Sequence, residues 1–280
     1  MTINFFILTR GRVGRQITLS NLPRSIRKKT YLVVEKDEYQ EHRGEKMHDI
    51  AGILKFKKQW GNFVLDGSGN FSDKKQWTTE YCLKKDIRYM VLLDDDLKFD
   101  ARKEGKLKPA KNKDVVKAFK QLHEWMKNGF AHVAMSPREG NNWVEEDYIE
   151  VGRAMRVCGF DVKVLKKHNL KLNRTMLMGD FDITLQLLEL GYPNRILYSH
   201  ANGQRKSNDK GGCSLYRTPE RMTEAANSLK KLHPKFVTVK QVKTSKPWAG
   251  FDTKIRTDVQ VSWKKAYEYG VSKKKLSKFF

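Results

Sequence analysis

Cysteine and long apolar runs are scarce in this sequence, and acidic residues are far fewer than basic ones. The three cysteines, Cys82, Cys158 and Cys213, stand far apart without a CxxC pair, which argues against a disulfide framework and a structural zinc site. No run of 18 apolar residues occurs, so no membrane-spanning helix and no membrane partner are expected. The first ten residues lack the cationic start and long apolar block of a signal peptide. These absences predict a soluble, cytoplasmic protein.

The excess of basic over acidic residues makes this a strongly basic chain. Its 280 residues include 56 Lys and Arg against 32 Asp and Glu, a formal net charge of +24. A field of this size favours polyanionic partners. In the last 52 residues, 14 basic side chains alternate with aromatic ones, as in Trp263-Lys264-Lys265, and this combination suits phosphate contact with base stacking. Nucleic acid is the expected partner, and a solvated lysine-rich surface is the alternative.

Short apolar segments alternate with segments of helical periodicity along the chain. Strands are expected at residues 4–8, 31–34, 52–56, 89–93, 130–135, 162–165, 170–172 and 195–198, and helices at residues 74–85, 114–127, 181–190 and 219–231. Residues 61–72 are rich in Gly, Asn and Ser and precede the first of these helices, and the lysine-rich residues 98–113 are expected to be a flexible loop. The strands are apolar throughout, a pattern typical of an α/β domain whose mainly parallel sheet is covered by helices on both faces. Ligands of such sheets bind where the strands end at their carboxyl edge.

Three consecutive carboxylates, Asp94, Asp95 and Asp96, follow the most apolar predicted strand. At about 4 Å and an effective dielectric near 20, each close pair costs on the order of 4 kcal/mol, so a cation is expected beside them. Hard carboxylate ligands suit Mg²⁺ or Mn²⁺. Residues i and i+2 of an extended chain point the same way, so Asp94 and Asp96 can converge on one ion. The alternative is an acidic turn that caps a helix.

A second acidic pair, Asp180 and Asp182, begins the helix predicted near residue 181. Anions at this end of a helix are stabilised by its dipole, and capping alone would explain one of the two. We assign capping to Asp182 as the alternative to a catalytic role. Asp180 lies one step earlier and could face the cleft as a general base.

Over about residues 3–235, the Leu-Leu-Asp-Asp-Asp and Gly-Asp-Phe-Asp-Ile-Thr-Leu-Gln-Leu stretches resemble the GT-A glycosyltransferases. Within that superfamily the basic, small chain is most similar to the TET-associated glycosyltransferases, which glycosylate hydroxymethylated pyrimidines in bacteriophage DNA. The resemblance implies a GT-A-like domain at residues 1–235, with a basic aromatic extension at residues 236–280 packed on it. Gly179 stands where the family usually has an acidic residue before the base, which leaves inverting and retaining chemistry open.

The resemblance also implies a nucleotide-sugar donor, most simply a UDP-sugar, and a divalent ion, Mn²⁺ or Mg²⁺. Asp94, Asp96 and His200 are the implied metal ligands, and a structural role is the alternative for the histidine. Residues expected to contact the donor are Thr9, Arg10, Arg12, Arg15, Glu35, Asp37, Asp94, Asp95, Arg205 and Lys210.

The implied acceptor is double-stranded DNA that carries modified pyrimidines, in the host-cell cytoplasm if the protein is of phage origin. Arg138 could hold a phosphate and Trp143 could stack on a base, although Trp143 could equally belong to the core. Lys264 and Lys265 are candidate phosphate contacts, and no obligate protein partner is inferred.

Three other functions compete with this interpretation. A glycosyltransferase of the same mechanism could act on a polysaccharide, a protein or a small acceptor. A metal-dependent nuclease would also suit carboxylates and positive charge, but the sequence lacks a convincing second acidic cluster. A non-enzymatic DNA-binding protein is disfavoured because no helix-turn-helix or zinc-finger signature occurs.

Overall fold

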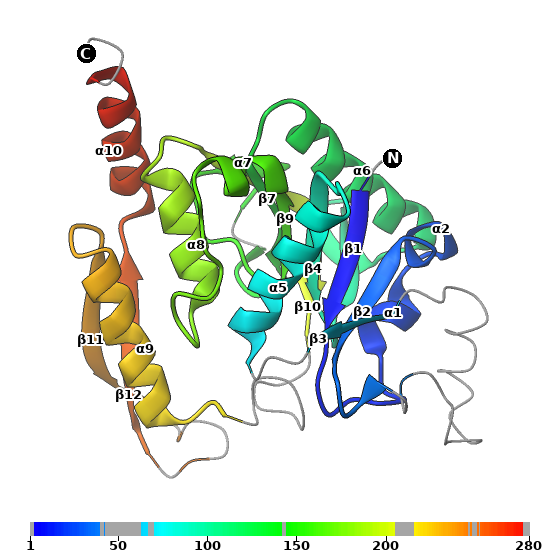
Figure 1. The fold of residues 1–280 in the computed structure, drawn as a ribbon, viewed down its shortest axis with the longest axis horizontal. Coiled ribbons are helices and arrows are strands. Elements are labelled where there is room, and N and C mark those ends of the chain that lie inside the picture. Colours follow the sequence, from blue (N-terminus) through cyan, green and yellow to red (C-terminus); the bar gives the residue numbers. More distant parts are fainter. Residues whose placement is uncertain are drawn as a thin grey trace.

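A ten-stranded sheet forms the centre of the protein in the computed structural model (Figure 1). The structure describes residues 3–39, 42, 70–141, 144–204, 216–245, 247, 251 and 253–276, together with the backbone of residues 63–66. The strands are β1 (Ile3–Leu8), β2 (Thr30–Glu35), β3 (Phe63–Asp66), β4 (Tyr89–Asp94), β5 (Lys98–Lys103), β6 (Lys106–Pro109), β7 (His132–Pro137), β8 (Tyr148–Glu150), β9 (Val157–Asp161) and β10 (Asn194–Gly203).

The strand order is β3-β2-β1-β4-β9-β7-β10-β5-β6, and β8 pairs with β10 beside this path. Only β5, β8 and β9 run against the direction shared by the other described strands of this sheet. The described helices are α1 (Ile17–Asn21), α2 (Arg24–Arg27), α5 (Phe71–Lys84), α6 (Asn112–Lys127), α7 (Val162–Lys167), α8 (Gly179–Leu188), α9 (Pro219–Leu232) and α10 (Trp263–Leu276). A separate hairpin joins β11 (Val237–Lys243) to β12 (Ile255–Val261).

Side chains of β1 alternate between two apolar cores, one on each face of the sheet. Phe5 and Ile7 belong to the core that α1, α2 and α6 cover, whereas Phe6 and Leu8 belong to the core under α5, α7 and α8. Figure 1 shows α5, α7 and α8 together on the near face of the sheet. The predicted α/β architecture, a mainly parallel sheet between helices, is therefore confirmed.

Most predicted elements that fall on described residues are present, with ends shifted by a few residues. The predicted strands at 4–8, 31–34, 89–93, 130–135 and 195–198 correspond to β1, β2, β4, β7 and β10, and the four predicted helices correspond to α5, α6, α8 and α9. The strand expected at 52–56 lies outside the described residues. Strands β8 and β9 were not predicted.

The loop predicted for residues 98–113 is wrong. Residues 98–109 form the hairpin β5–β6, and α6 begins at Asn112. Phe99 and Ala101 are buried where β5 pairs with β10. The many lysines around them hide this apolar strand pattern in the sequence. The stretch rich in Gly, Asn and Ser contains β3 and the start of α5, whose first amides are capped by the Asn70 side chain.

The two strands predicted at 162–165 and 170–172 are also wrong. Residues 162–167 form α7, and residues 170–172 belong to no strand or helix. The Asp161 carboxylate accepts a hydrogen bond from the Lys163 amide and so caps the helix at its first turn. This local cap overrides the β-branched character of Val162 and Val164.

The last described elements form a block beside α8, on the side away from β1 (Figure 1). Phe236, Val237 and Ala266 share a buried cluster with Leu185 and Leu188 of α8. Gly270 lets α10 approach closely, since a Cβ there would lie 2.2 Å from the Leu188 carbonyl oxygen. The predicted domain division between residues 235 and 236 stays a prediction. Within the described part of the chain, no helix is both long and apolar enough to cross a membrane.

Candidate functional site

The carboxyl ends of β1, β2 and β4 meet at one edge of the sheet. Leu8 at the end of β1 pairs with Val33 of β2 and with Asp94 of β4. Thr9, Glu35 and the three aspartates follow directly from these strands, so the structure brings these predicted site residues together. Parallel pairing alone accounts for this convergence.

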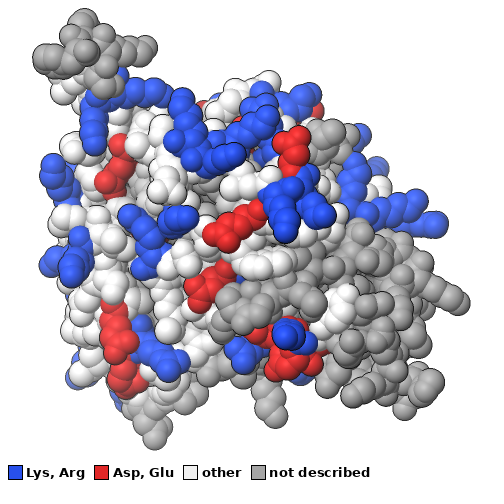
Figure 2. All heavy atoms as spheres, viewed as in Figure 1, with Lys and Arg blue, Asp and Glu red and all other residues white. Residues whose placement is uncertain are grey.

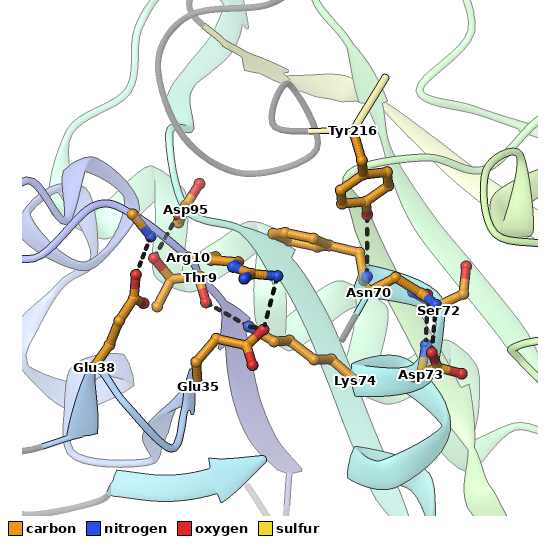
Figure 3. A network of polar contacts seen from close by, with 12 residues as sticks. Thr9, Arg10, Glu35, Glu38, Asn70, Ser72, Asp73, Lys74, Asp95 and Tyr216 are labelled. Carbon is orange, nitrogen blue, oxygen red and sulfur yellow. Dashed lines mark hydrogen bonds and ion pairs between the residues drawn. The ribbon is translucent and has the colours of Figure 1, made fainter. Parts of the chain in front are cut away.

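Lys74 of α5 ties the ends of β1 and β2 together (Figure 3). Its ammonium group donates to the Thr9 carbonyl oxygen at 2.8 Å and forms an ion pair with Glu35 at 2.9 Å, while the lysine is 0% exposed. Arg10 approaches the same Glu35 carboxylate at 3.7 Å. A buried lysine is rare unless it is paired, so Lys74 fixes the geometry of this edge. The sequence analysis missed this residue because it reads as an ordinary polar position of a helix.

Arg12 supplies the cation expected beside the carboxylates. Its guanidinium contacts Asp95 directly and lies 3.3 Å from Asp96. Thr9 also donates to Asp95, at 2.6 Å, yet burial keeps the pKa of Asp95 above its usual value. Arg12 was predicted to contact the donor nucleotide; in this structure its guanidinium contacts the two aspartates.

Asp94 is the carboxylate of this group that lines a cleft of about 890 Å³. Burial raises the pKa of Asp94 to about 6, and the charges of Asp96 and Asp95 act in the same direction. Lys75 and Arg156, which line the cleft as well, oppose the shift. The cleft therefore holds a carboxylate that is easily protonated and that gains from a nearby cation.

Asp180 lines the same cleft from the first turn of α8. The Arg153 guanidinium donates two hydrogen bonds to one oxygen of Asp180, at 3.0 and 3.2 Å, and stacks on the Phe181 ring at 3.9 Å from its centroid. These contacts hold the carboxylate at the cleft wall. Asp94 and Asp180, 86 positions apart in the sequence, thus line one cavity.

Asp182, predicted beside Asp180, is placed differently. It is 0% exposed and does not line the cleft. Arg174 donates to it at 3.1 Å, Gln186 at 2.9 Å, and the His233 ring lies at 2.8 Å. Burial by itself raises the pKa of Asp182, but the hydrogen bonds from His233 and Arg174 outweigh it, and the pKa lies below its usual value.

Gly179 occupies a position with little room for a side chain. A Cβ there would lie 3.2 Å from the Ser72 hydroxyl oxygen and 3.4 Å from the Leu172 carbonyl oxygen. The start of α8 therefore packs closely against the start of α5. This contact gives a physical reason for glycine where the family usually has an acidic residue.

His200 lies in β10 opposite Ala101 of β5 and does not line the cleft. It is 8% exposed, and burial lowers its pKa, with Asp114 and Lys117 among the nearby charges. The structure thus does not place it beside the cleft carboxylates. In the part of the chain that the structure describes, no group of three or more His, Cys, Asp or Glu residues is arranged to hold a metal ion.

The remaining predicted residues are spread more widely. Arg138 forms an ion pair with the buried Asp100 at 2.7 Å, and Arg15 donates to the Gly11 carbonyl oxygen at 2.8 Å. Asp37 is exposed in the turn after β2, and Lys264 and Lys265 are exposed at the start of α10. The predicted residues that lie outside the described part of the chain are Trp143, Arg205 and Lys210.

Several cleft residues were not anticipated from the sequence. They come from the start of α5, the segments around residues 153–156 and 176–178, and the elements α9 and β12; the charged ones are Lys75, Arg153, Arg156, Arg217, Glu220, Glu224, Arg256 and Asp258. No local motif marks them, since they converge only through packing. The clustering of Met176 and Met178 before Gly179 was the one sequence signal available.

A family model described as TET-Associated Glycosyltransferase matches residues 3–212. A comparison with curated proteins found no match. Among solved structures, mannose-1-phosphate geranyltransferase from Thermus thermophilus is similar at 14% identity and a TM-score of 0.42, covering 70% of this chain and 74% of that one. GalNAc-T7 with UDP, GalNAc and Mn²⁺ is similar at 8% identity and a TM-score of 0.49, covering 73% of this chain and 44% of that one.

Proposed function

Because the chain belongs to the TET-associated glycosyltransferase family, and is thus a nucleotide-sugar-dependent glycosyltransferase, we propose that it transfers a sugar to a hydroxymethylated pyrimidine in double-stranded DNA. The observation that supports this proposal best is the presence of Asp94 and Asp180 in one cleft. Glycosyl transfer needs a group that neutralises the departing diphosphate and, in an inverting enzyme, a base for the acceptor hydroxyl.

The charge of the protein supports a DNA acceptor. Figure 2 shows Lys and Arg side chains distributed over the described face, interspersed with fewer Asp and Glu. In α10 the exposed lysines are Lys264, Lys265, Lys273, Lys274 and Lys275. A broadly basic surface attracts a long polyanion without selecting its sequence.

The cleft carboxylates also suit a divalent ion. Mg²⁺ and Mn²⁺ are commonly held by one or two protein carboxylates together with substrate phosphates. Burial raises the pKa of Asp94, and a cation bound beside it would favour the ionised carboxylate. Asp94 would hold the ion, whereas Asp96 would need Arg12 to release it. The ion would stabilise the negative charge that develops on the departing diphosphate.

Three side chains of the protein would bind the donor, accept the proton and position the base. Lys75, at the first turn of α5, would contact the donor diphosphate, and Asp180 would accept the proton of the acceptor hydroxyl. Asp182, held by Arg174 and His233, would position α8 and with it Asp180. A UDP-sugar remains the simplest donor.

The direct test is incubation of the protein with hydroxymethylated duplex DNA and a panel of nucleotide sugars, with nucleoside mass spectrometry as the readout. We expect a mass increase of one sugar residue on the modified pyrimidine. Transfer should stop in excess EDTA and return with Mn²⁺ or Mg²⁺. Full transfer in EDTA would exclude the metal, and transfer only to a polysaccharide or protein would overturn the DNA acceptor.

Asp180→Asn should lower kcat by about 10² to 10⁴ if the carboxylate is the general base, because the amide has the same size but accepts no proton. Binding of the donor, measured by calorimetry, should stay near normal. Asp258→Asn is the matched control, since Asp258 also lines the cleft but stands on β12. Normal turnover of Asp180→Asn would assign Asp180 to helix capping and the pairing with Arg153.

A further inference from the structure

One wall of the cleft is built by residues beyond the segment that the family model matches. That match ends at residue 212, whereas α9 begins at Pro219 and β12 at Ile255. Both elements line the cleft that contains Asp94 and Asp180. The wall thus lies outside the segment that the family model matches.

This wall is held in a fixed arrangement. Thr223 of α9 and Thr257 of β12 share a hydrogen bond of 2.5 Å between their hydroxyl groups, and Gln241 of β11 donates to Thr257 at 2.9 Å. Leu229 of α9 is buried with Leu185 of α8, the helix that carries Asp180. The wall and the candidate base are therefore parts of one packed unit.

Exposed apolar side chains gather in the cleft. Met176 is 47% exposed and Ile255 is 59% exposed, and both line it. Three further methionines, Met155, Met178 and Met222, are partly exposed and line it as well. Four of the nine methionines of the chain thus lie in one cavity. Solvent-exposed apolar groups concentrated in a cleft mark a binding surface, and thioethers adapt to and attract aromatic rings.

The charges of the lining residues cancel. The cations are Lys75, Arg153, Arg156, Arg217 and Arg256, and the anions are Asp94, Asp180, Glu220, Glu224 and Asp258. With Lys75 and Asp94 assigned to the donor diphosphate, the rest of the cleft has no excess of positive charge for the DNA backbone, and its apolar wall suits an uncharged flat ring. Its volume of about 890 Å³ is near the upper end of the roughly 300–1,000 Å³ typical of ligand pockets, which leaves room for a base beside the donor sugar.

We propose that Met176 and Ile255, on opposite sides of the family boundary in the sequence, form an acceptor subsite that receives the pyrimidine base after it leaves the duplex stack. The proposal rests on the proposed function, of which it specifies the acceptor site. The base contacts the apolar wall inside the cleft, while the sugar-phosphate backbone stays outside with the surface lysines. Extrusion of a base costs a few kcal/mol and costs least for a mispaired base.

The test measures kcat/KM with hydroxymethylated duplex for Met176→Ala, Ile255→Ala and the double variant. Burial of an apolar side chain of this size against the base is worth about 1.5–3 kcal/mol, so we expect a decrease of about 10- to 150-fold, largest in the double variant. Donor KM and the slow hydrolysis of the nucleotide sugar without DNA should not change. Leu276→Ala is the matched control, an exposed apolar residue (62%) at the end of α10 and not among the cleft residues.

A second measurement compares duplexes in which the modified pyrimidine is paired or mispaired. Wild type should show a higher kcat/KM for the mispaired duplex. Equal kcat/KM for both duplexes would overturn the subsite, and so would a double variant whose kcat/KM equals that of wild type. In either case, transfer by wild type would leave the proposed function intact. A rise in donor KM in the variants would instead assign the wall to the donor. Absence of transfer by wild type to any hydroxymethylated DNA would overturn the proposed function itself.

Discussion

Asp94→Asn should lower kcat by about 10² to 10³ under saturating donor and acceptor, the loss typical when one group that stabilises transition-state charge is removed. The variant should fold normally. Asparagine keeps the size of the side chain and removes one of three crowded negative charges from a position where burial, and then the charges of Asp96 and Asp95, already raise the pKa of Asp94. The expected decrease follows from the loss of the cleft carboxylate that could hold a cation next to the diphosphate. Single-turnover rates with hydroxymethylated DNA and thermal melting curves measure the two effects.

The matched comparison is Asp96→Asn. Asp96 is 8% exposed, lies 3.3 Å from the Arg12 guanidinium and is absent from the cleft lining. If Asp96 serves only to orient Arg12, its replacement should reduce kcat far less than the replacement of Asp94. If the two losses are equally large, both carboxylates hold the ion, as the i, i+2 spacing predicts. An active Asp94→Asn enzyme would contradict the role of Asp94.

Asp182→Ala should lower the free energy of unfolding by about 3–5 kcal/mol, because removal of one partner leaves buried charges without compensation. The His233 ring presents both nitrogens to carboxylates: one contacts Glu189 and the other lies 2.8 Å from Asp182. Carboxylates at both ring nitrogens favour the ring form with two N–H donors, and these hydrogen bonds raise the pKa of His233. Urea unfolding followed by circular dichroism gives the measurement. Glu124→Ala, which breaks an exposed ion pair with Lys127, is the control and should cost less than about 1 kcal/mol.

The same pair predicts how stability changes with pH. Burial alone lowers the pKa of His233, but the hydrogen bonds to Asp182 and Glu189 outweigh it and raise the pKa, although Arg174 lies 3.1 Å from the ring. The contribution of His233 to the free energy of unfolding is fully present below about pH 6.5 and is lost as pH rises through its raised pKa. The contribution of Asp182 is present above about pH 3.9 and is lost as pH falls through its lowered pKa. The pair should therefore stabilise the protein most between these two pH values, and Asp182→Ala should flatten the plot of stability against pH.

The predicted edge of the sheet illustrates what a sequence can reveal. The unbroken apolar run before Asp94 identifies a buried strand, and parallel pairing then brings Thr9, Glu35 and Asp94 to one place without further information. The family resemblance also rests on short segments, the two acidic motifs, because each motif consists of residues that are neighbours in the chain. The hairpin at 98–109 and the helix α7 escaped prediction because a lysine-rich strand and a capped valine-rich helix contradict the usual propensities.

The sequence by itself determined the α/β class, the strand ends that carry the acidic cluster, and the basic character that favours a polyanion. Only the tertiary structure decided which carboxylates line the cleft and which are buried in ion pairs. Asp180 and Asp182 are two residues apart, but on a helix this spacing turns them to different sides, so Asp180 meets the cleft and Asp182 is buried against Arg174 and His233. The same is true of the wall that contains Ile255, because long-range packing, which local sequence does not encode, carries β12 to the cleft.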